Sequence, residues 1–225
     1  TPTGPWRGPG HLQFAFAVES MTDELAHAAK MDPYLFRKEL YEGHGTYKYE
    51  GYGAKEIDAR RMWRCYEEVA QMSNWSTKRP NGIGLGIAGH FTFGSYAAFV
   101  VEVDATDAPN YRVTKCWGSI DCGLAVNPNH IVNQMEGGFI DGLNAAIYNE
   151  TAIENGKVIS NNFHRFKTLR MKESPLQFEV SILKNTHPPT GVGEPPTAPA
   201  AAALANALFD ATGQRLRSLP LKLEA

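Results

Sequence analysis

The sequence has few of the residues that build metal centres and disulfide frameworks. Its three cysteines, Cys65, Cys116 and Cys122, form no CxxC pair and no even set. We therefore expect free or buried thiols, and neither a zinc site nor a disulfide scaffold. No apolar run approaches the length of a membrane span. The net charge is −2, with the basic residues scattered, which argues against a nucleic acid or an anionic membrane as the partner.

The sequence also lacks an internal repeat, a signal peptide and an initiator methionine. We therefore expect a chain that begins after processing or partway through a larger protein. Its 225 residues, 43% of them hydrophobic, suffice for one large domain or two small ones with a real core.

The first part of the chain predicts three structural helices behind an irregular loop. Glycine and proline dominate residues 4–10, so Trp6 and Arg7 lie either in a flexible leader or in a functional loop. The first predicted helix runs from Leu12 to about Ala28, and the second starts at Asp32-Pro33 and runs to about Leu40. A polar connector over 42–53 then leads to a helix over 55–73. The apolar residues at helical spacing in the first helix are Phe14, Ala17, Val18, Met21, Leu25 and Ala28.

After Arg79 the periodicity changes to that of strands. We predict strands over 81–94, 96–103, 111–120 and 176–182, helices over 129–148 and 198–211, a small hairpin turning at Asn155-Gly156, and an edge strand over 215–221. Gly82, Gly84 and Gly86 spell GxGxG, but the last glycine of the dinucleotide motif and the helix after it are missing. We therefore reject a Rossmann assignment.

The stretch from His187 to Gly213, HPPTGVGEPPTAPAAAALANALFDATG, places one carboxylate between a glycine turn and an alanine-rich helix. Glu194 either supports the start of that helix, a routine role for an acid, or serves a function of its own. The helix over 129–148 carries Gly137 and Gly138 in its interior, where each glycine costs roughly 1 kcal/mol against alanine. We therefore expect another backbone or a ligand close to them.

Five runs in this order resemble the C-terminal part of the molybdenum-binding subunit of the xanthine dehydrogenase and aldehyde oxidase family. In particular they are similar to the branch that holds the beta chains of isoquinoline oxidoreductases, which includes periplasmic aldehyde dehydrogenases. The runs are PWRGPGH, VESMTDELAHAAKMDPYLFR, SIDCGLAVNPNHIVNQMEGGFIDGL, NNFHRFKTLRMKESP and GVGEPPTAPAAAALANALFDATGQRLRSLP. The resemblance implies an α+β fold with mixed sheets packed with helices. It divides the chain into a helical segment with a cofactor-facing loop (residues 1–80) and an α/β molybdopterin-binding segment (residues 81–225).

The resemblance also assigns roles to residues. It makes Glu194 the catalytic base, and it places molybdenum on the pterin dithiolene with no protein ligand. Pro9 stands where xanthine-oxidising relatives have a phenylalanine, which argues against xanthine as substrate. The residues that the resemblance places against the cofactor are Trp6, Arg7, Gly8, Gln134, Gly191, Val192 and Gly193.

The implied activity is that of a molybdenum hydroxylase, which oxidises an aldehyde or an N-heteroaromatic compound with oxygen from water. The implied cofactors are molybdopterin cytosine dinucleotide on this chain and [2Fe-2S] clusters on a partner, because this chain has no cysteine cluster for them. The expected partners are the complementary N-terminal piece of the molybdenum-binding subunit, the iron–sulfur subunit, and a c-type cytochrome or an FAD subunit. We expect the periplasm, with the cytoplasm as the alternative. A non-catalytic cofactor-binding or assembly module is the competing hypothesis.

Overall fold

A four-stranded sheet forms the centre of the computed structural model, which describes residues 3–51 and 54–224. The strands lie in the order β3, β4, β5, β8, with β8 parallel to β5 and the other neighbours antiparallel. Their bounds are Ile83–Thr92, Ser95–Asp104, Arg112–Asp121 and Gln177–Ile182. The four predicted strands are therefore confirmed, with ends that differ by no more than two residues.

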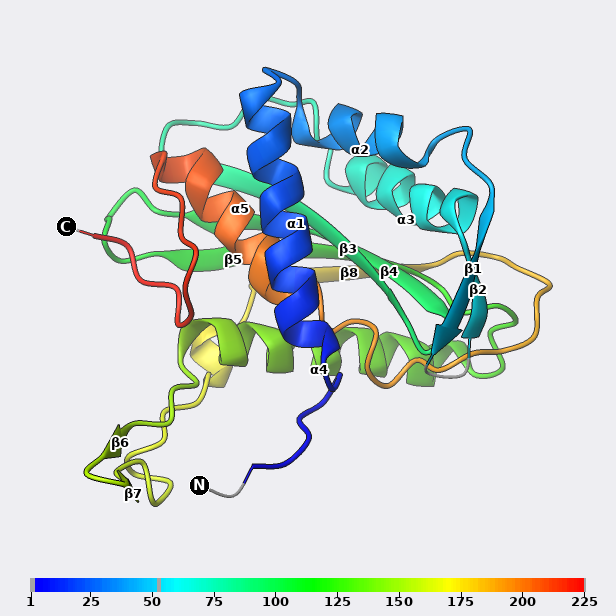
Figure 1. The fold of residues 1–225 in the computed structure, drawn as a ribbon. Helices are drawn as coiled ribbons and strands as arrows, with labels where there is room; N and C mark the ends of the chain where they lie inside the picture. Colours follow the sequence, from blue (N-terminus) through cyan, green and yellow to red (C-terminus); the bar gives the residue numbers. More distant parts are fainter. Residues whose placement is uncertain (1–2, 52–53, 225) are drawn as a thin grey trace.

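Helices cover both faces of this sheet, as Figure 1 shows for α3 (Ala59–Met72) on one side and α4 (Pro128–Ile147) on the other. Side chains alternate along a strand, so Phe99 and Val101 of β4 pack with α4 and α5 (Ala200–Thr212), whereas Val100 packs with α3. Burial on both faces explains why β4 is apolar almost throughout.

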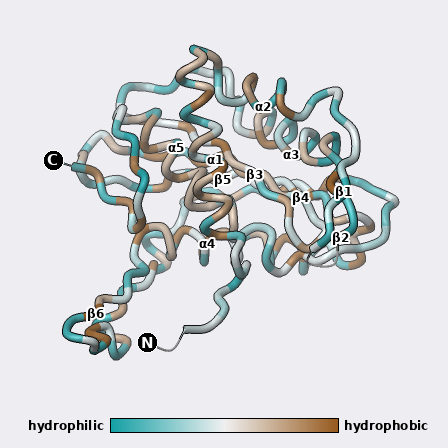
Figure 2. The backbone as a smooth tube through the Cα atoms, in the orientation of Figure 1, coloured by the Kyte–Doolittle hydropathy of each residue, from teal (hydrophilic) through white to brown (hydrophobic). Residues whose placement is uncertain are grey.

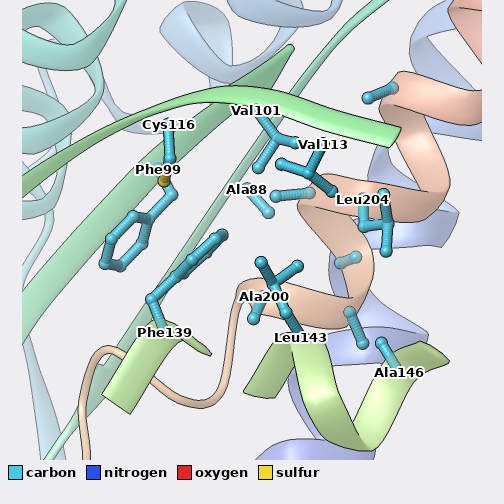
Figure 3. Packing of buried hydrophobic residues seen from close by; sticks show 14 of the residues in the cluster. Ala88, Phe99, Val101, Val113, Cys116, Phe139, Leu143, Ala146, Ala200 and Leu204 are labelled. Atoms are coloured by element: carbon cyan, nitrogen blue, oxygen red, sulfur yellow. The ribbon is translucent and has the colours of Figure 1, made fainter. Parts of the chain in front are cut away.

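The core on the α4 and α5 side combines small residues with stacked aromatic rings. Figure 3 shows Phe139 of α4 beside Phe99, and the two ring centroids lie 4.2 Å apart. Alanines let α5 approach β3 closely, and a Cβ on Gly86 would lie 2.1 Å from the Ala203 carbonyl oxygen. The GxGxG stretch is therefore a packing surface for α5, which agrees with the rejection of a Rossmann assignment.

Two further helices, α1 (His11–Ala28) and α2 (Pro33–Tyr41), lie against this body. Asp32 caps α2 as predicted, because its Oδ1 accepts a bond of 2.8 Å from the Tyr34 N–H. The connector prediction was wrong, since β1 (Thr46–Gly51) and β2 (Ala54–Asp58) form a hairpin there. The last two residues of that connector lie outside the described residues.

The third helix starts later than predicted because residues 55–58 belong to β2. Asp58 caps α3 by accepting a bond of 2.9 Å from the Arg60 N–H, and its own N–H donates to the Tyr96 hydroxyl at 2.7 Å. α5 begins at Ala200 and ends at Thr212, and Gly213 caps it in the left-handed conformation with φ 76°.

The small hairpin of β6 (Ile153–Glu154) and β7 (Lys157–Val158) turns at Asn155-Gly156 as predicted and extends away from the body in Figure 1. The prediction of an edge strand over 215–221 was wrong. Leu221 uses its backbone groups elsewhere, because its N–H donates to the Ala146 carbonyl at the end of α4 and its carbonyl accepts from the Tyr111 hydroxyl.

Side chains of α1 and α5 form hydrogen bonds with the backbone groups at the free edge of β3. The Leu85 N–H donates to Asp210, the Ile87 carbonyl accepts from Asn206, and the Gly89 N–H donates to Glu19. These bonds block pairing with another strand at this edge. No helix in the described part of the chain is both long and apolar enough to cross a bilayer.

Candidate functional site

Two loops from opposite ends of the chain meet beside α4. The Gly8 N–H donates to Glu194 Oε2 at 2.6 Å. Arg7 donates from Nε to the Gly193 carbonyl at 2.7 Å and from Nη2 to Gln134 Oε1 at 2.8 Å. The structure therefore joins residues that are up to 186 positions apart in the sequence, all of them among the predicted site residues.

The conformation of the first loop depends on glycine. Gly8 and Gly10 have φ values of 72° and 77°, in the left-handed region that L side chains rarely adopt. The Gly8 carbonyl accepts a bond of 2.9 Å from the His11 N–H at the start of α1. The turn thereby aims the Gly8 N–H at the carboxylate and starts the helix at the same time.

The second loop is held by the turn between β3 and β4. The Gly191 N–H donates to the Phe93 carbonyl at 3.1 Å, and the Gly191 carbonyl accepts from Ser95 Oγ at 2.6 Å. Ser95 Oγ also lies 2.7 Å from Thr190 Oγ1. The chain is therefore fixed three residues before Glu194.

Glu194 does not cap α5. The N-cap of α5 is Pro199, which makes no side-chain cap bond, and the Glu194 carboxylate faces Gly8 instead. Its carbonyl accepts a bond of 3.0 Å from the Thr197 N–H, which shapes the turn into the helix. The hypothesis of a simple helix-start acid therefore lacks its expected contact.

The interior glycines of α4 allow close packing beside this site. A Cβ on Gly138 would lie 2.6 Å from Pro196 Cγ and 3.1 Å from Arg7 Nη2, and one on Gly142 would lie 2.5 Å from the Thr197 carbonyl oxygen. At Gly138 the neighbours are therefore side chains and not the expected backbone, whereas another backbone approaches at Gly142, outside the predicted pair.

Two glycines at the site instead face open space. Apart from the adjoining residues and the backbone of α4 itself, no described residue comes within 4 Å of the place that a Cβ would take on Gly137 or on Gly193. Arg7 binds both the Gly193 carbonyl and Gln134, so the open space at Gly193 lies next to the Arg7 guanidinium and the exposed Gln134 amide. These donors suit an anionic, oxygen-rich group such as a phosphorylated pterin, so the residues present fit molybdopterin.

Two histidines contact each other where the start of α1 meets β3, and this pair was not predicted. His11 Nδ1 and His90 Nε2 are 2.8 Å apart. Burial lowers the pKa of His90 to about 3. Burial also lowers the pKa of His11, while the charge of Glu194 acts in the opposite direction. Nothing in the sequence links these two residues, because their contact depends on how α1 packs against β3.

The other predicted site residues occupy less decisive positions. The Trp6 side chain is 45% exposed, and Val192 is partly buried against the core formed with α4 and α5. Asp141 was not predicted; its carboxylate lies 3.8 Å from Arg7 Nη1. The three cysteines are buried free thiols, as expected.

Comparison with known proteins agrees with the family resemblance of the sequence. The model of a family described as "Molybdopterin cofactor-binding domain" matches residues 15–175. The beta chain of isoquinoline 1-oxidoreductase from Brevundimonas diminuta is 31% identical over 96% of this chain and 26% of its own length. One of the subunits of nicotinate dehydrogenase from Pseudomonas putida is 32% identical over 97% of this chain and 18% of its own length. The chain thus spans about a quarter or less of these relatives.

Solved structures confirm the predicted α+β fold. The aldehyde oxidoreductase from Desulfovibrio gigas aligns with a TM-score of 0.72 and 14% identity, over 96% of this chain and 40% of that protein. The enzyme from Desulfovibrio desulfuricans aligns with a TM-score of 0.71. At this level of identity the likeness concerns the fold alone.

Proposed function

The chain belongs to the molybdopterin cofactor-binding domain family, and from this premise we propose that it is the part of a molybdenum hydroxylase that carries the general base. The reaction is the oxidation of an aldehyde or an N-heteroaromatic compound, with water as the source of oxygen. The observation that carries the proposal is the bond of 2.6 Å between the Gly8 N–H and Glu194 Oε2. It holds a carboxylate in a fixed position beside an opening bordered by bare backbone.

Each group of the site has a distinct task in this proposal. Arg7, the Gly191–Gly193 backbone and Gln134 hold the cofactor, which supplies the two-electron redox chemistry when bound. Glu194 keeps Oε2 on the Gly8 N–H and accepts at Oε1 the proton that the water-derived nucleophile loses as it attacks the substrate carbon. Arg7 fixes the loop through the Gly193 carbonyl, so the carboxylate stays aligned between turnovers.

The substrate class follows the names of the relatives. The relatives include an isoquinoline 1-oxidoreductase, a nicotinate dehydrogenase and a membrane-bound aldehyde dehydrogenase. An electron-poor carbon next to a ring nitrogen and an aldehyde carbonyl accept the same nucleophile, so one base serves both. Assays with isoquinoline, nicotinate and benzaldehyde, using one artificial electron acceptor, separate the candidates.

The proposal extends to the assembly. We place the cofactor's cytosine dinucleotide form on this chain, and the [2Fe-2S] clusters that accept its electrons on a partner. A c-type cytochrome or an FAD subunit would complete the chain of carriers. We also place the complex in the periplasm. Metal and cofactor analysis after purification, together with cell fractionation, tests these points.

The decisive experiment replaces Glu194 by glutamine in the complete enzyme complex. Glutamine keeps an oxygen for the Gly8 N–H but accepts no proton, so we expect turnover to fall by a factor on the order of 10² to 10⁴. Molybdenum content should stay unchanged because the amide fills the same space. Glu154→Gln, in the exposed β6–β7 hairpin, is the matched control and should turn over normally.

Two outcomes would count against this assignment. A fully metallated Glu194→Gln complex with the wild-type rate would remove Glu194 as the base. A wild-type complex without stoichiometric molybdenum would instead favour the non-catalytic module.

A further inference from the structure

Helix α1 presents an apolar face to the outside. Its largest exposed side chains follow the helical repeat, at positions i, i+4, i+7 and i+11, and so lie on one face. They are between 51% and 64% exposed. We call this set the α1 stripe: Phe14, Val18, Met21 and Leu25.

The opposite face of the same helix is buried and combines polar residues with the small side chains of Ala15 and Ala26, which are 0% exposed. Glu19, Ser20 and Asp23 are between 2% and 6% exposed. Arg37 of α2 binds Glu19, and Arg215 binds Asp23. In an ordinary surface helix the large apolar side chains would face the core, so α1 reverses this arrangement for the four residues of its stripe. Figure 2 shows the hydrophobic residues recurring along α1, and in Figure 1 it lies in front of α5.

From this reversal we infer that the α1 stripe is the docking surface for the remaining part of the molybdenum-binding subunit. The inference rests on the proposed function for the identity of the occupant. An exposed apolar face of this kind marks an interaction site. This chain matches only 26% and 18% of the length of its two relatives, so the remainder of such a subunit is large enough to cover it.

The stripe is continuous with the candidate site. Phe14 is three residues from His11, whose N–H binds the Gly8 carbonyl, and the Gly8 N–H binds Glu194. A partner seated on α1 therefore also reaches the opening beside Gly193. Such a partner would complete the enclosure of the site as it buries the stripe.

The composition of α1 disfavours a lipid surface. Helices that lie on membranes carry Lys and Arg on their polar face, whereas the 18 residues of α1, HLQFAFAVESMTDELAHA, contain neither. Their polar face is already used inside the protein by Glu19 and Asp23.

A second copy of this chain is also a poor occupant. A helix of 18 residues is about 27 Å long. A contact about 10 Å wide along it covers roughly 300 Å² per partner, well below the roughly 800 Å² of a stable interface. A partner that also covers the Arg7 and Glu194 loops adds the missing area.

The first test measures whether the stripe is covered in the purified native complex. Met21→Cys and Met171→Cys are each treated with a maleimide, and the native thiols contribute little because all three are buried. Met21 is 53% and Met171 is 92% exposed in this chain, so exposure alone predicts labelling rates less than twofold apart. Burial of the stripe predicts labelling at position 21 at least about tenfold slower, since the core of an interface excludes solvent.

The second test identifies the occupant by crosslinking. The complex is produced with photo-methionine, which has nearly the shape of methionine, then irradiated and digested, and the peptides joined to residue 21 are sequenced. We expect peptides from the remaining part of the molybdenum-binding subunit. Peptides from a second copy of this chain or from any other protein of the complex, a lipid adduct, or fast labelling of Met21→Cys would each overturn the inference.

These outcomes are separable from those of the proposed function. A Glu194→Gln complex with normal turnover would remove the base and leave the crosslink from residue 21 in place. A crosslink to a second copy would remove the docking surface and leave the effect of Glu194→Gln unchanged.

Discussion

Helices α1 and α3 both carry large apolar residues at helical spacing but place them in different environments. α3 buries apolar side chains such as Met62 and Val69 against the sheet. α1 buries Glu19 and Asp23 beside small alanines and exposes the four large apolar side chains of its stripe. The apolar face of α3 is covered by the sheet of this chain, whereas the described residues of this chain cover only the face of α1 opposite its stripe. The comparison teaches that an apolar repeat predicts a helix and a contact face, but not that the contact lies in the same chain.

The buried acids of α1 have a structural reason. Glu19 binds the Arg37 guanidinium, accepts from the Tyr66 hydroxyl and accepts from the Gly89 N–H at the free edge of β3. One carboxylate thus links three helices and an edge strand. An apolar side chain at this position would leave the backbone edge and the Arg37 guanidinium without their partner.

The largest expected effect comes from breaking this polar face. Arg37 and Glu19 are 0% and 3% exposed, and their closest atoms are 2.8 Å apart. Arg37→Met leaves an unpaired buried carboxylate, so we expect a loss of about 3–5 kcal/mol in the free energy of unfolding, measured by urea denaturation.

Two matched variants sharpen this first prediction. The double variant Glu19→Gln with Arg37→Met removes both charges and should recover part of the loss. Arg60→Met breaks the pair with Asp58, in which the Arg60 side chain is 66% exposed, and should cost far less than Arg37→Met because water screens an exposed pair. If Arg37→Met cost no more than Arg60→Met, the buried face of α1 would not depend on its ion pair.

The second prediction applies one substitution to both helices. Met62 is 3% and Met21 is 53% exposed. Met62→Ala should cost about 2–5 kcal/mol of unfolding free energy because it leaves a cavity. Met21→Ala should stay within about 0.5 kcal/mol in this chain, and should weaken assembly of the complete complex. Equal costs in this chain would remove the contrast between the helices.

Local pattern was enough to predict most of the fold. Apolar alternation gave the four strands of the sheet, and Asp32-Pro33 and Gly213 gave helix ends, because these signals act within a few residues. The β1–β2 hairpin was missed because the segment is short and rich in charged residues and glycine, although Tyr47 and Tyr49 alternate with polar residues in β1. The sequence could not predict that the α1 stripe is exposed, because periodicity does not say which side of a helix is covered.

The candidate site was predicted differently. Arg7, Gly8, Gln134 and Glu194 were linked only through a resemblance to known loops, because no local rule relates residues 186 positions apart. The structure brings them together, and their roles stay predictions. The His11–His90 contact had neither a local pattern nor a loop motif to reveal it.

The third and smallest expected effect uses this histidine pair, because α1 also carries a titratable group on its buried face. The protein around His90 lowers its pKa to about 3, against about 6.5 for an unfolded chain. Between these values the unfolded state binds a proton that the folded state does not. Stability therefore falls as the pH falls from about 6.5 toward 3. The lowered pKa of His11 acts in the same direction, whereas the raised pKa values of Asp23 and Asp210 act in the opposite one.

His90→Gln isolates the contribution of that ring, because the two aspartates are present in both proteins and cancel in the difference. Acidification from pH 7 to pH 5 should destabilise the wild type by about 1–2 kcal/mol more than His90→Gln, given about 1.4 kcal/mol for each pH unit below 6.5. Urea denaturation at both pH values measures this difference. His164→Gln, an exposed histidine, is the matched control and should follow the wild type. If acidification lowered the unfolding free energy of the wild type and of His90→Gln by the same amount, the buried face of α1 would be insensitive to pH at this contact. The contrast with α3 would then rest on the Arg37–Glu19 pair alone.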